Sequence, residues 1–495
     1  MEQERIDAIA GDVLQKLREQ RGEAGGWKRF DREPPRQRKY AAYVDAASGP
    51  SAGAASGTFP NVETAFAAAR EAQQTYQKIS LEQRYAIVES VRRTMRAHVE
   101  EISRLAVEET GLGRAADKVQ KNLLVTNKSP GPEILRPEAW SGDHGLMITE
   151  PAPYGVIGAI TPSTNPSETV INNGIGMIAA GNAIVFNAHP GAKRVTQRTL
   201  ALFNAAIVEA GGPPNLLTSC AEPTIETAQQ LMQHPGIRLL VVTGGAGVVQ
   251  AAFKSGKKVI AAGPGNPPVV VDETADLVKA ARESVAGASL DNNVICTSEK
   301  ETLCVASVVD ALLDAMVKAG CYLLTAAQAA ELRKHVLAED RGPGKVGVIQ
   351  RDLIGKNASV LLRRIGVHAG DDVRLAIYKA EPDDPLVWTE QLMPVYPVVP
   401  VRDVDAAIDL AVQVEHGFGH TATMWSRNID KLSEMARRIN TSIFVKNGPS
   451  YAGLGLGGEG YTSFTIASPT GEGLTNARHF SRYRRCTLVD HFRIV

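Results

Sequence analysis

One cysteine, Cys296, stands in a stretch whose residue types could do covalent chemistry. It follows the polar run Asp291-Asn292-Asn293 and precedes the small polar pair Thr297-Ser298. A thiolate is the strongest common side-chain nucleophile near neutral pH when a helix N-terminus or backbone donors lower its pKa. A free cysteine more often packs as a small apolar side chain. This stretch alone therefore predicts either a covalent catalyst or a buried structural thiol.

The composition of the chain excludes several classes of function. Its 495 residues are enough for two or three domains. Lys+Arg and Asp+Glu number 54 each, and this zero net charge argues against binding to nucleic acid or to an anionic membrane. The five cysteines lack CxxC spacing, and no apolar run reaches the ~20 residues of a membrane span. We therefore expect a cytoplasmic protein without a disulfide framework, a metal site or a membrane-spanning segment.

The first 58 residues differ in character from the rest of the chain. Residues 1–20 place apolar side chains at helical spacing, which predicts an amphipathic helix. Residues 21–58 are rich in Gly, Ala, Ser, Pro and Arg, which predicts a flexible linker. From the pattern alone, the helix could fold back on its own core or lie in the groove of a partner protein.

The remaining chain has the pattern of an α/β protein. Residues 61–128 predict three helices, and a second α/β region follows residue 267. A C-terminal strand, covering 485–490 and 492–495, should pair with 146–153 or with another subunit. In the first region, predicted helices alternate with strands expected at 156–160, 182–187, 216–219, 239–243 and 258–262. Strands that alternate with crossover helices form a parallel, doubly wound sheet.

Three turns that follow predicted strands have the composition of ligand-binding loops. They are Thr-Pro-Ser-Thr-Asn-Pro at 161–166, Asn-Ala-His-Pro at 187–190 and Thr-Gly-Gly-Ala-Gly at 243–247. Ligands of such sheets bind at the carboxyl ends of the strands. The glycines of the third turn stand at a predicted helix N-terminus, where free amides can meet a phosphate. The turn lacks GxGxxG spacing, so it is a weak nucleotide signal by itself.

Taken in order, these stretches resemble the aldehyde dehydrogenase superfamily over roughly residues 60–495. The turn at 161–166, the phosphate turn at 243–245 and the segment 390–395 are similar to motifs of that family. The resemblance implies that Cys296 is the nucleophile and that Asn165, with the backbone amide of Cys296, forms the oxyanion hole. It places the cofactor against Ile160, Thr161, Pro162, Asn187, His189, Thr243, Gly244, Gly245, Gly263, Glu390 and Leu392, with Glu390 on the nicotinamide ribose.

Two departures from the family pattern carry information. Hydrolytic members have a Glu that activates water, and Ala261 stands in its place. A general base typically contributes 10²–10⁴-fold, so an active enzyme without it should pass its acyl group to a thiol. Asn187 replaces a Lys near the adenosine ribose, so we expect NAD, with NADP left open. His416 and His420 are expected to be surface or structural residues.

The polar run at 291–293, the segment 262–268 and the ending 484–490 resemble the coenzyme A-acylating branch of the family. The resemblance implies oxidation of propionaldehyde with NAD and coenzyme A to propionyl-CoA and NADH, through a thioester on Cys296. NAD and coenzyme A would bind in the same groove, one after the other, in a ping-pong cycle. Acetaldehyde as the substrate, a reductase of an activated semialdehyde and a non-catalytic assembly component are the alternatives.

Members of this branch from bacterial microcompartments, such as those that use propanediol, carry an N-terminal amphipathic helix on a linker, as residues 1–58 do in kind. The resemblance therefore implies a location inside a microcompartment, contact of residues 1–20 with shell or core proteins, and a homodimer or homotetramer. The expected domains are a nucleotide-binding domain (59–135 and 154–262), a catalytic domain (263–454) and oligomerisation strands (136–153 and 470–495).

Overall fold

The computed structural model describes residues 56–495, so the predicted N-terminal helix and the linker up to residue 55 lie outside the described residues. The predicted linker extends too far at its C-terminal end. Thr58 and Phe59 form strand β1 (Thr58–Phe59), which pairs in parallel with β6 (Leu217–Cys220). Backbone pairing to a buried strand, which composition does not reveal, orders these two residues.

Four helices, where the sequence predicted three, precede the first long strands. They are α2 (Val62–Tyr76), α3 (Leu81–Ala97), α4 (Val99–Thr110) and α5 (Ala115–Lys128). The hydroxyl of Ser80 caps α3 by accepting a hydrogen bond from the Gln83 amide. His98, whose φ of −109° lies outside the helical range, separates α3 from α4. Neither Gly nor Pro marks this break, so the helical spacing of apolar residues continues through it in the sequence.

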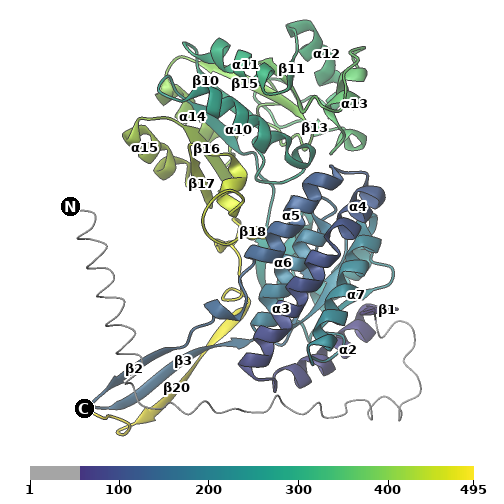
Figure 1. Ribbon diagram of the computed structural model, residues 1–495, viewed down its shortest axis with the longest axis vertical. Coiled ribbons are helices and arrows are strands. Elements are labelled where there is room, and N and C mark those ends of the chain that lie inside the picture. The colour runs from purple at the N-terminus through teal and green to yellow at the C-terminus, as the bar shows by residue number, and fades with distance from the viewer. Residues whose placement is uncertain (1–55) are drawn as a thin grey trace, which may run out of the picture. The chain divides into compact units, whose positions relative to one another are not determined.

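The first parallel sheet contains β1 and five longer strands, in the order β1-β6-β5-β4-β7-β8 (Figure 1). The longer strands besides β6 are β4 (Val156–Ile160), β5 (Ala183–Asn187), β7 (Leu239–Thr243) and β8 (Lys258–Ala262), and their connecting helices are α6 (Pro166–Ala179), α7 (Lys193–Glu209), α8 (Ile225–Gln233) and α9 (Ala246–Phe253). From β4 the chain builds outward to one side through β5 and β6, and then to the other through β7 and β8. The junction of β4 and β7 is thus the switch point where such sheets bind ligands.

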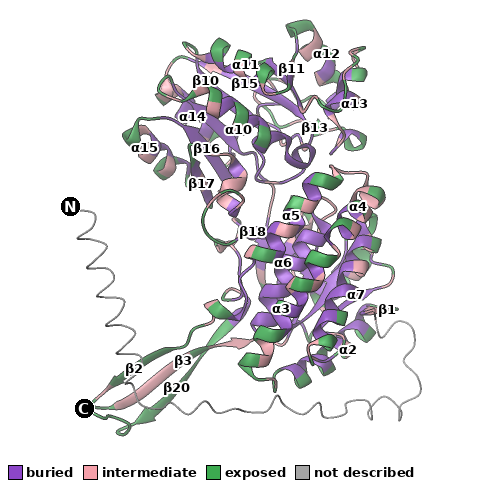
Figure 2. Cartoon of the chain, in the orientation of Figure 1, coloured by how far each residue is buried: buried purple, intermediate pink, exposed green. Residues whose placement is uncertain are grey.

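This topology explains which elements of the first sheet are buried. Helix α6 and strands β4 and β5 are buried along their whole length, because helices cover both faces of a parallel sheet (Figure 2).

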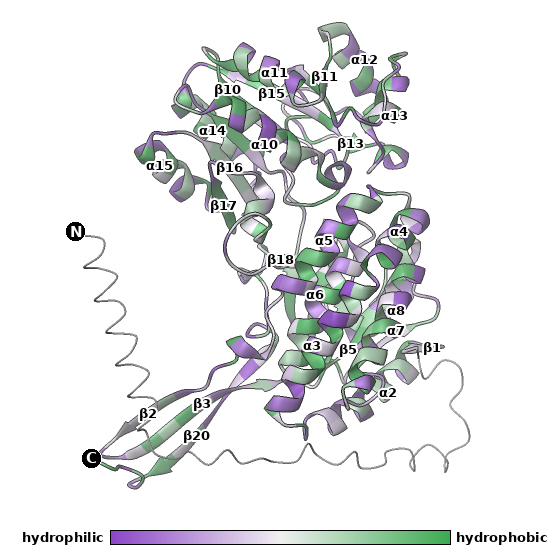
Figure 3. Cartoon of the chain, viewed as in Figure 1, coloured by the Kyte–Doolittle hydropathy of each residue, from purple (hydrophilic) through white to green (hydrophobic). Residues whose placement is uncertain are grey.

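A second, seven-stranded parallel sheet has the order β11-β14-β15-β10-β9-β16-β17. Apolar clusters fill its two faces, and strands such as β10, β16 and β17 are hydrophobic in Figure 3. The strands are β9 (Pro268–Val271), β10 (Glu301–Val305), β11 (Cys321–Leu323), β14 (Leu375–Lys379), β15 (Val395–Val401), β16 (Thr421–Trp425) and β17 (Ile443–Lys446). The helices are α10 (Leu277–Ser289), α11 (Val309–Lys318), α12 (Ala326–Val336), α13 (Ala358–Arg363), α14 (Val404–Val414) and α15 (Ile429–Ile439). The two sheets confirm the predicted α/β fold class.

The C-terminal strand pairs as predicted. Strand β20 (Ser481–Val489) runs antiparallel to β3 (Gly145–Pro153), which also pairs with β2 (Glu138–Gly142). Residues 490–495 lie outside the strand. β20 is exposed along nearly all of its length, including Tyr483 and Val489. Short antiparallel pairs are formed by β12 (Leu337–Glu339) with β13 (Val348–Ile349) and by β18 (Ile466–Ala467) with β19 (Gly473–Leu474). Within residues 56–495, no helix is long and apolar enough to cross a membrane.

Candidate active site

A cavity of about 490 Å³ lies at the switch point of the first sheet. The turns after β4, β5, β7 and β8 line one part of it, and the Cys296 loop, Glu390 and Leu392 line another. Every site residue predicted from the sequence lines this one cavity: Ile160, Thr161, Pro162, Asn165, Asn187, His189, Thr243, Gly244, Gly245, Gly263, Cys296, Glu390 and Leu392. Phe464, Val294 and Ile225 also line it. The sequence pattern did not single out these three apolar residues, because only the fold brings them here.

The loop that carries Cys296 begins with an unusual backbone turn. Asp291, Asn292 and Asn293 have φ angles of 52°, 55° and 68°, in the left-handed region that non-glycine residues rarely adopt. Each such residue costs about 1–3 kcal/mol unless its surroundings hold it. Here the surroundings do so: the Asn292 amide donates to the Gly355 carbonyl at 2.9 Å, and the Asn293 amide to the Ala288 carbonyl at 2.8 Å. The polar run therefore serves to place the loop.

The surroundings of Cys296 keep its thiol protonated. Burial is the largest cause, and the negative charge of Glu390 is the next; together they raise the pKa of Cys296 to about 12. The ammonium groups of Lys300 and Lys121 act in the opposite direction without balancing them. Desolvation also lowers the pKa of Lys300 to about 8 and raises that of Glu390. Addition of the thiol to a carbonyl must therefore include loss of its proton.

Asn165 lies at the N-terminus of α6, held by a lysine that the sequence pattern did not predict to be buried. Its side-chain oxygen accepts a hydrogen bond from Lys121 Nζ at 2.6 Å, and its amide nitrogen donates to Thr164 Oγ1 at 3.2 Å. Lys118 and Lys121, both on α5, are 0% and 1% exposed and both contact the Asp291 carboxylate. Helix α5 carries three lysines among other polar residues, and its sequence gives no signal that two of them face inward.

Comparison with known proteins now decides the family. The sequence model of the Aldehyde dehydrogenase family matches residues 34–465. The chain belongs to this family. The acetaldehyde dehydrogenase (acetylating) EutE of Salmonella typhimurium is 52% identical over 440 residues, which cover 89% of this chain and 94% of that protein.

Solved structures of two relatives agree with the family assignment. A propionaldehyde dehydrogenase from the Clostridium phytofermentans fucose utilisation bacterial microcompartment matches with a TM-score of 0.86 at 44% identity, over 89% of this chain and 100% of that one. The Rhodopseudomonas palustris propionaldehyde dehydrogenase, solved with bound CoA and an acylated cysteine, matches with a TM-score of 0.85 at 46% identity, over 88% and 98%.

The residues at the switch point fit the nicotinamide dinucleotide that aldehyde dehydrogenases use. Helix α9 begins directly after Gly245, where no side chain caps it, and a Cβ built on Gly245 would meet nothing within 4 Å. Free backbone amides and open space at a helix N-terminus suit a phosphate. The Asn187 amide is already engaged: its nitrogen donates to the Thr224 carbonyl at 3.3 Å, and its oxygen accepts from the Thr227 hydroxyl at 2.6 Å. Asn187 therefore shapes the wall next to α8.

The cavity of this aldehyde dehydrogenase is poor in groups that could activate water. Of the described residues that line it, Glu390 alone is a carboxylate. Ala262, the last residue of β8, lines the cavity, whereas its neighbour Ala261 is buried in the core. Alternate side chains of a strand face opposite sides, so an acid would have to replace Ala262, or stand beyond it, to point into this cavity.

The two histidines near the end of α14 differ in their surroundings. A ring nitrogen of His416 lies 2.9 Å from the Trp388 carbonyl, as in a structural contact. His420 is fully buried, and its Nε2 atom has no hydrogen-bond partner among residues 56–495. A Cβ built on Gly265 would lie 3.0 Å from both the His420 ring and the Cys296 carbonyl oxygen, so His420 lies behind the Cys296 loop. Burial lowers its pKa to about 4, and the imidazole is therefore neutral at pH 7.

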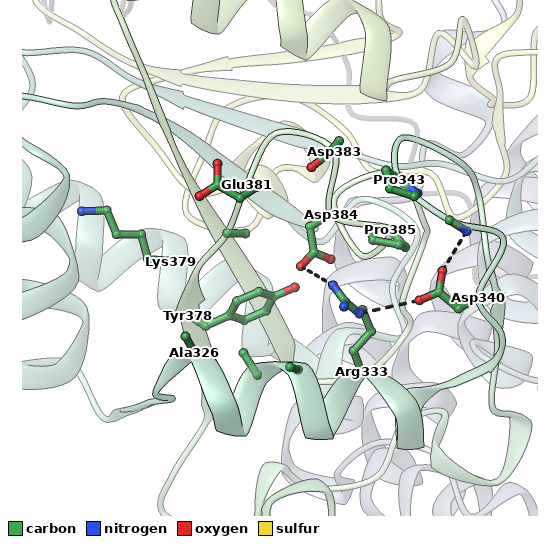
Figure 4. A pocket seen from close by; sticks show the side chains of 14 residues that line it. Ala326, Arg333, Asp340, Pro343, Tyr378, Lys379, Glu381, Asp383, Asp384 and Pro385 are labelled. Carbon is green, nitrogen blue, oxygen red and sulfur yellow. Dashed lines mark hydrogen bonds and ion pairs between the residues drawn. The ribbon is translucent and has the colours of Figure 1, made fainter.

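A second cavity, of about 330 Å³, lies beside α12 and after β14 (Figure 4). Arg333 projects into it and forms ion pairs with Asp384 at 3.2 Å and Asp340 at 3.6 Å. The described residues that line this cavity include neither cysteine nor histidine. The charge of Arg333 is thus matched by its neighbours, and Cys296 lies in the other cavity.

Proposed function

We propose that this protein oxidises propionaldehyde to propionyl-CoA, with NAD as the electron acceptor and a thioester on Cys296 as the intermediate. One observation carries the proposal: Cys296 and Asn165 share a cavity with the turns predicted to bind a nucleotide, and among the described lining residues only Glu390 is a carboxylate. The relatives add support, since one is an acetylating enzyme and another was solved with CoA and an acylated cysteine.

In the first half of the reaction, Sγ of Cys296 loses its proton and bonds to the aldehyde carbon, and the aldehyde oxygen takes up negative charge. Asn165 Nδ2 and the backbone amide of Cys296 are proposed to donate hydrogen bonds to that oxygen, each worth about 3–4 kcal/mol in comparable sites. NAD, when bound, supplies the acceptor for the hydride that leaves the same carbon. Glu390 is proposed to orient its ribose, and Gly244 and Gly245 its pyrophosphate. The acyl group then remains on Cys296 as a thioester.

In the second half, the CoA thiol attacks the thioester carbon, the bond to Cys296 Sγ breaks, and Cys296 recovers a proton. Water would need a general base, worth typically 10²–10⁴-fold. The described lining residues offer one carboxylate, which the cofactor ribose is proposed to occupy, and one imidazole, that of His189, which is also proposed to contact the cofactor. A thiol is intrinsically more nucleophilic and can replace the water. We propose that NAD and CoA use the same groove by turns, because Cys296 and the turns proposed to bind NAD line the same cavity.

The decisive experiment measures NADH formation from propionaldehyde with and without CoA on purified protein. Steady turnover should require CoA, and Cys296→Ala should abolish it. Without CoA, about one NADH per active site should appear, followed by a steady rate at least about 100-fold lower, since a general base is missing. Rapid steady turnover without CoA would refute the acylating function and indicate a hydrolytic dehydrogenase.

Acetaldehyde is the second candidate substrate, favoured by the 52% identity to an acetylating relative. One methylene in an apolar pocket changes specificity by only ~1–3 kcal/mol, so both aldehydes should react. Comparing kcat/KM for the two aldehydes decides between them, and the same assay with NADP in place of NAD tests the cofactor preference.

Assembly is proposed from the exposed strands and from the relatives. We propose a homodimer or homotetramer built on β3 and β20, and a location in a bacterial microcompartment, as in the C. phytofermentans relative. Residues 1–20 are proposed to bind a shell or core protein. A fluorescent protein fused to these residues, expressed with shell proteins, should concentrate in foci; a diffuse signal would contradict the docking role.

A further inference from the structure

The side chain of Asn165 does not cap its own helix, although its position at the helix N-terminus favours a cap. Asn165 is the N-cap residue of α6, where an asparagine oxygen usually accepts a hydrogen bond from the first helical turn. No such bond forms here, and the oxygen instead accepts from Lys121 Nζ at 2.6 Å. The side chain is thus turned away from its own helix by a contact to residue 121 on α5.

This contact fixes which face of the amide is available for chemistry. An ammonium group can only donate, so the atom of Asn165 that faces Lys121 must be the oxygen. The amide nitrogen then points the other way, with one hydrogen directed to Thr164 Oγ1 at 3.2 Å and its second hydrogen left for a ligand. A flipped amide would bring its NH₂ group against the ammonium, which is repulsive. Lys121 therefore selects the orientation in which Asn165 can donate to an oxyanion.

Lys121 is in turn held by two buried carboxylates. Its Nζ atom lies 2.5 Å from Asp291 and 3.0 Å from Glu168, which are both fully buried. Lys118 Nζ donates to the same Asp291 oxygen at 2.8 Å and to the Thr164 carbonyl at 3.1 Å. A buried ammonium held by several acceptors has little freedom to move.

Asp291 also begins the turn that leads to Cys296. Its backbone amide donates to the Asp117 carboxylate at 2.8 Å, and its second carboxylate oxygen accepts from the Arg114 amide at 2.7 Å. Asp291 thus connects the two proposed donors of the oxyanion hole. Its carboxylate contacts Lys121, which contacts Asn165, and its backbone begins the loop that presents the Cys296 amide.

We propose that Lys121 is a positioning residue of the oxyanion hole, which fixes the donor face of Asn165 and, through Asp291, keeps it in register with the Cys296 loop. This inference rests on the proposed function, because Asn165 must be the oxyanion donor for Lys121 to act through it.

The test is a double-mutant cycle on the NADH burst, which reports acylation at saturating propionaldehyde. Asn165→Ala should slow the burst about 10²–10³-fold, the usual effect of losing one oxyanion donor. Lys121→Met should slow it about 10–100-fold. The double variant should be no slower than Asn165→Ala alone, because a lysine that acts only through Asn165 has nothing left to position. Multiplied effects in the double variant would overturn the inference.

Two further variants separate positioning from folding. Lys121→Gln keeps an N–H that can reach the Asn165 oxygen and should recover most of the burst rate relative to Lys121→Met; equal loss in both would overturn the inference. If Lys121→Met does not fold, the cycle is run with Lys121→Ala, which also lacks a donor to the Asn165 oxygen. Lys118→Met is the matched control, since Lys118 contacts Asp291 but not the Asn165 side chain, and its effect should multiply with that of Asn165→Ala.

The proposed function fails separately from this inference. A normal burst in Asn165→Ala would remove Asn165 from the oxyanion hole, and the inference about Lys121 would fall with it. If Asn165→Ala slows the burst and Lys121→Met multiplies that loss in the double variant, Asn165 remains an oxyanion donor and only the positioning role of Lys121 is refuted.

Discussion

The resting thiol of Cys296 should react as a poor nucleophile below pH 9. With its pKa raised to about 12 by burial and by the charge of Glu390, roughly one thiol in 10⁵ is ionised at pH 7, compared with about 3% of a free cysteine. Alkylation by iodoacetamide should therefore rise about tenfold per pH unit from pH 7 to pH 9.5 without levelling, because thiolate forms only as the pH approaches the pKa.

The assay follows carbamidomethylation of the Cys296 peptide by mass spectrometry at short times, with glutathione as the free-thiol reference. Restricted access to the half-buried thiol lowers every rate equally, so the slope against pH carries the information. Two variants give opposite signs. Glu390→Gln removes a negative charge and should move the profile to lower pH. Lys300→Met removes a charge that is positive below about pH 8, so it should slow the reaction near pH 7 and have little effect above pH 9. A wild-type profile that levels below pH 9 would refute this account of the site.

Three other changes test the packing around the site and the assembly. Gly113→Ala should lower the thermal midpoint and the activity together, because Gly113 has φ +77° and a Cβ there would overlap the Asp291 carboxylate, which has no room to move; unchanged activity would contradict this. Burial raises the pKa of Glu299 to about 7. The free energy of unfolding should therefore fall as the pH rises from about 4.5 to 7, because the carboxyl group ionises more readily in the unfolded chain. Glu299→Gln should therefore raise the thermal midpoint at pH 8 but not at pH 4.5, and an equal change at both would refute the assignment. Removing residues 481–495 deletes the partner of β3 and should reduce the mass measured by light scattering to that of a smaller assembly; an unchanged oligomer would exclude β20 from the interface.

Several features of the fold could be predicted because their signals are local in the sequence. Strands β4 and β7 were predicted with the bounds observed, since short apolar runs end there at polar or glycine turns. The sequence predicted three helices within residues 61–128 where the structure has four, and one of the breaks, at His98, has neither Gly nor Pro to mark it. The linker prediction included Thr58, which composition could not separate from its neighbours, although pairing with Ser219 places it in the sheet.

The sequence by itself determined the chemistry that we expect. Cys296, the turn with Asn165 and the turn at 243–247 stand in the family's order and indicate thioester formation beside a nucleotide. What only the tertiary structure decided is how these groups are held. Lys121 and Asp291 are 170 residues apart, and nothing near either one predicts that both are buried or that they meet. A buried ion pair forms only where the fold excludes water and brings the charges together. Packing α5 against the Cys296 loop provides both conditions.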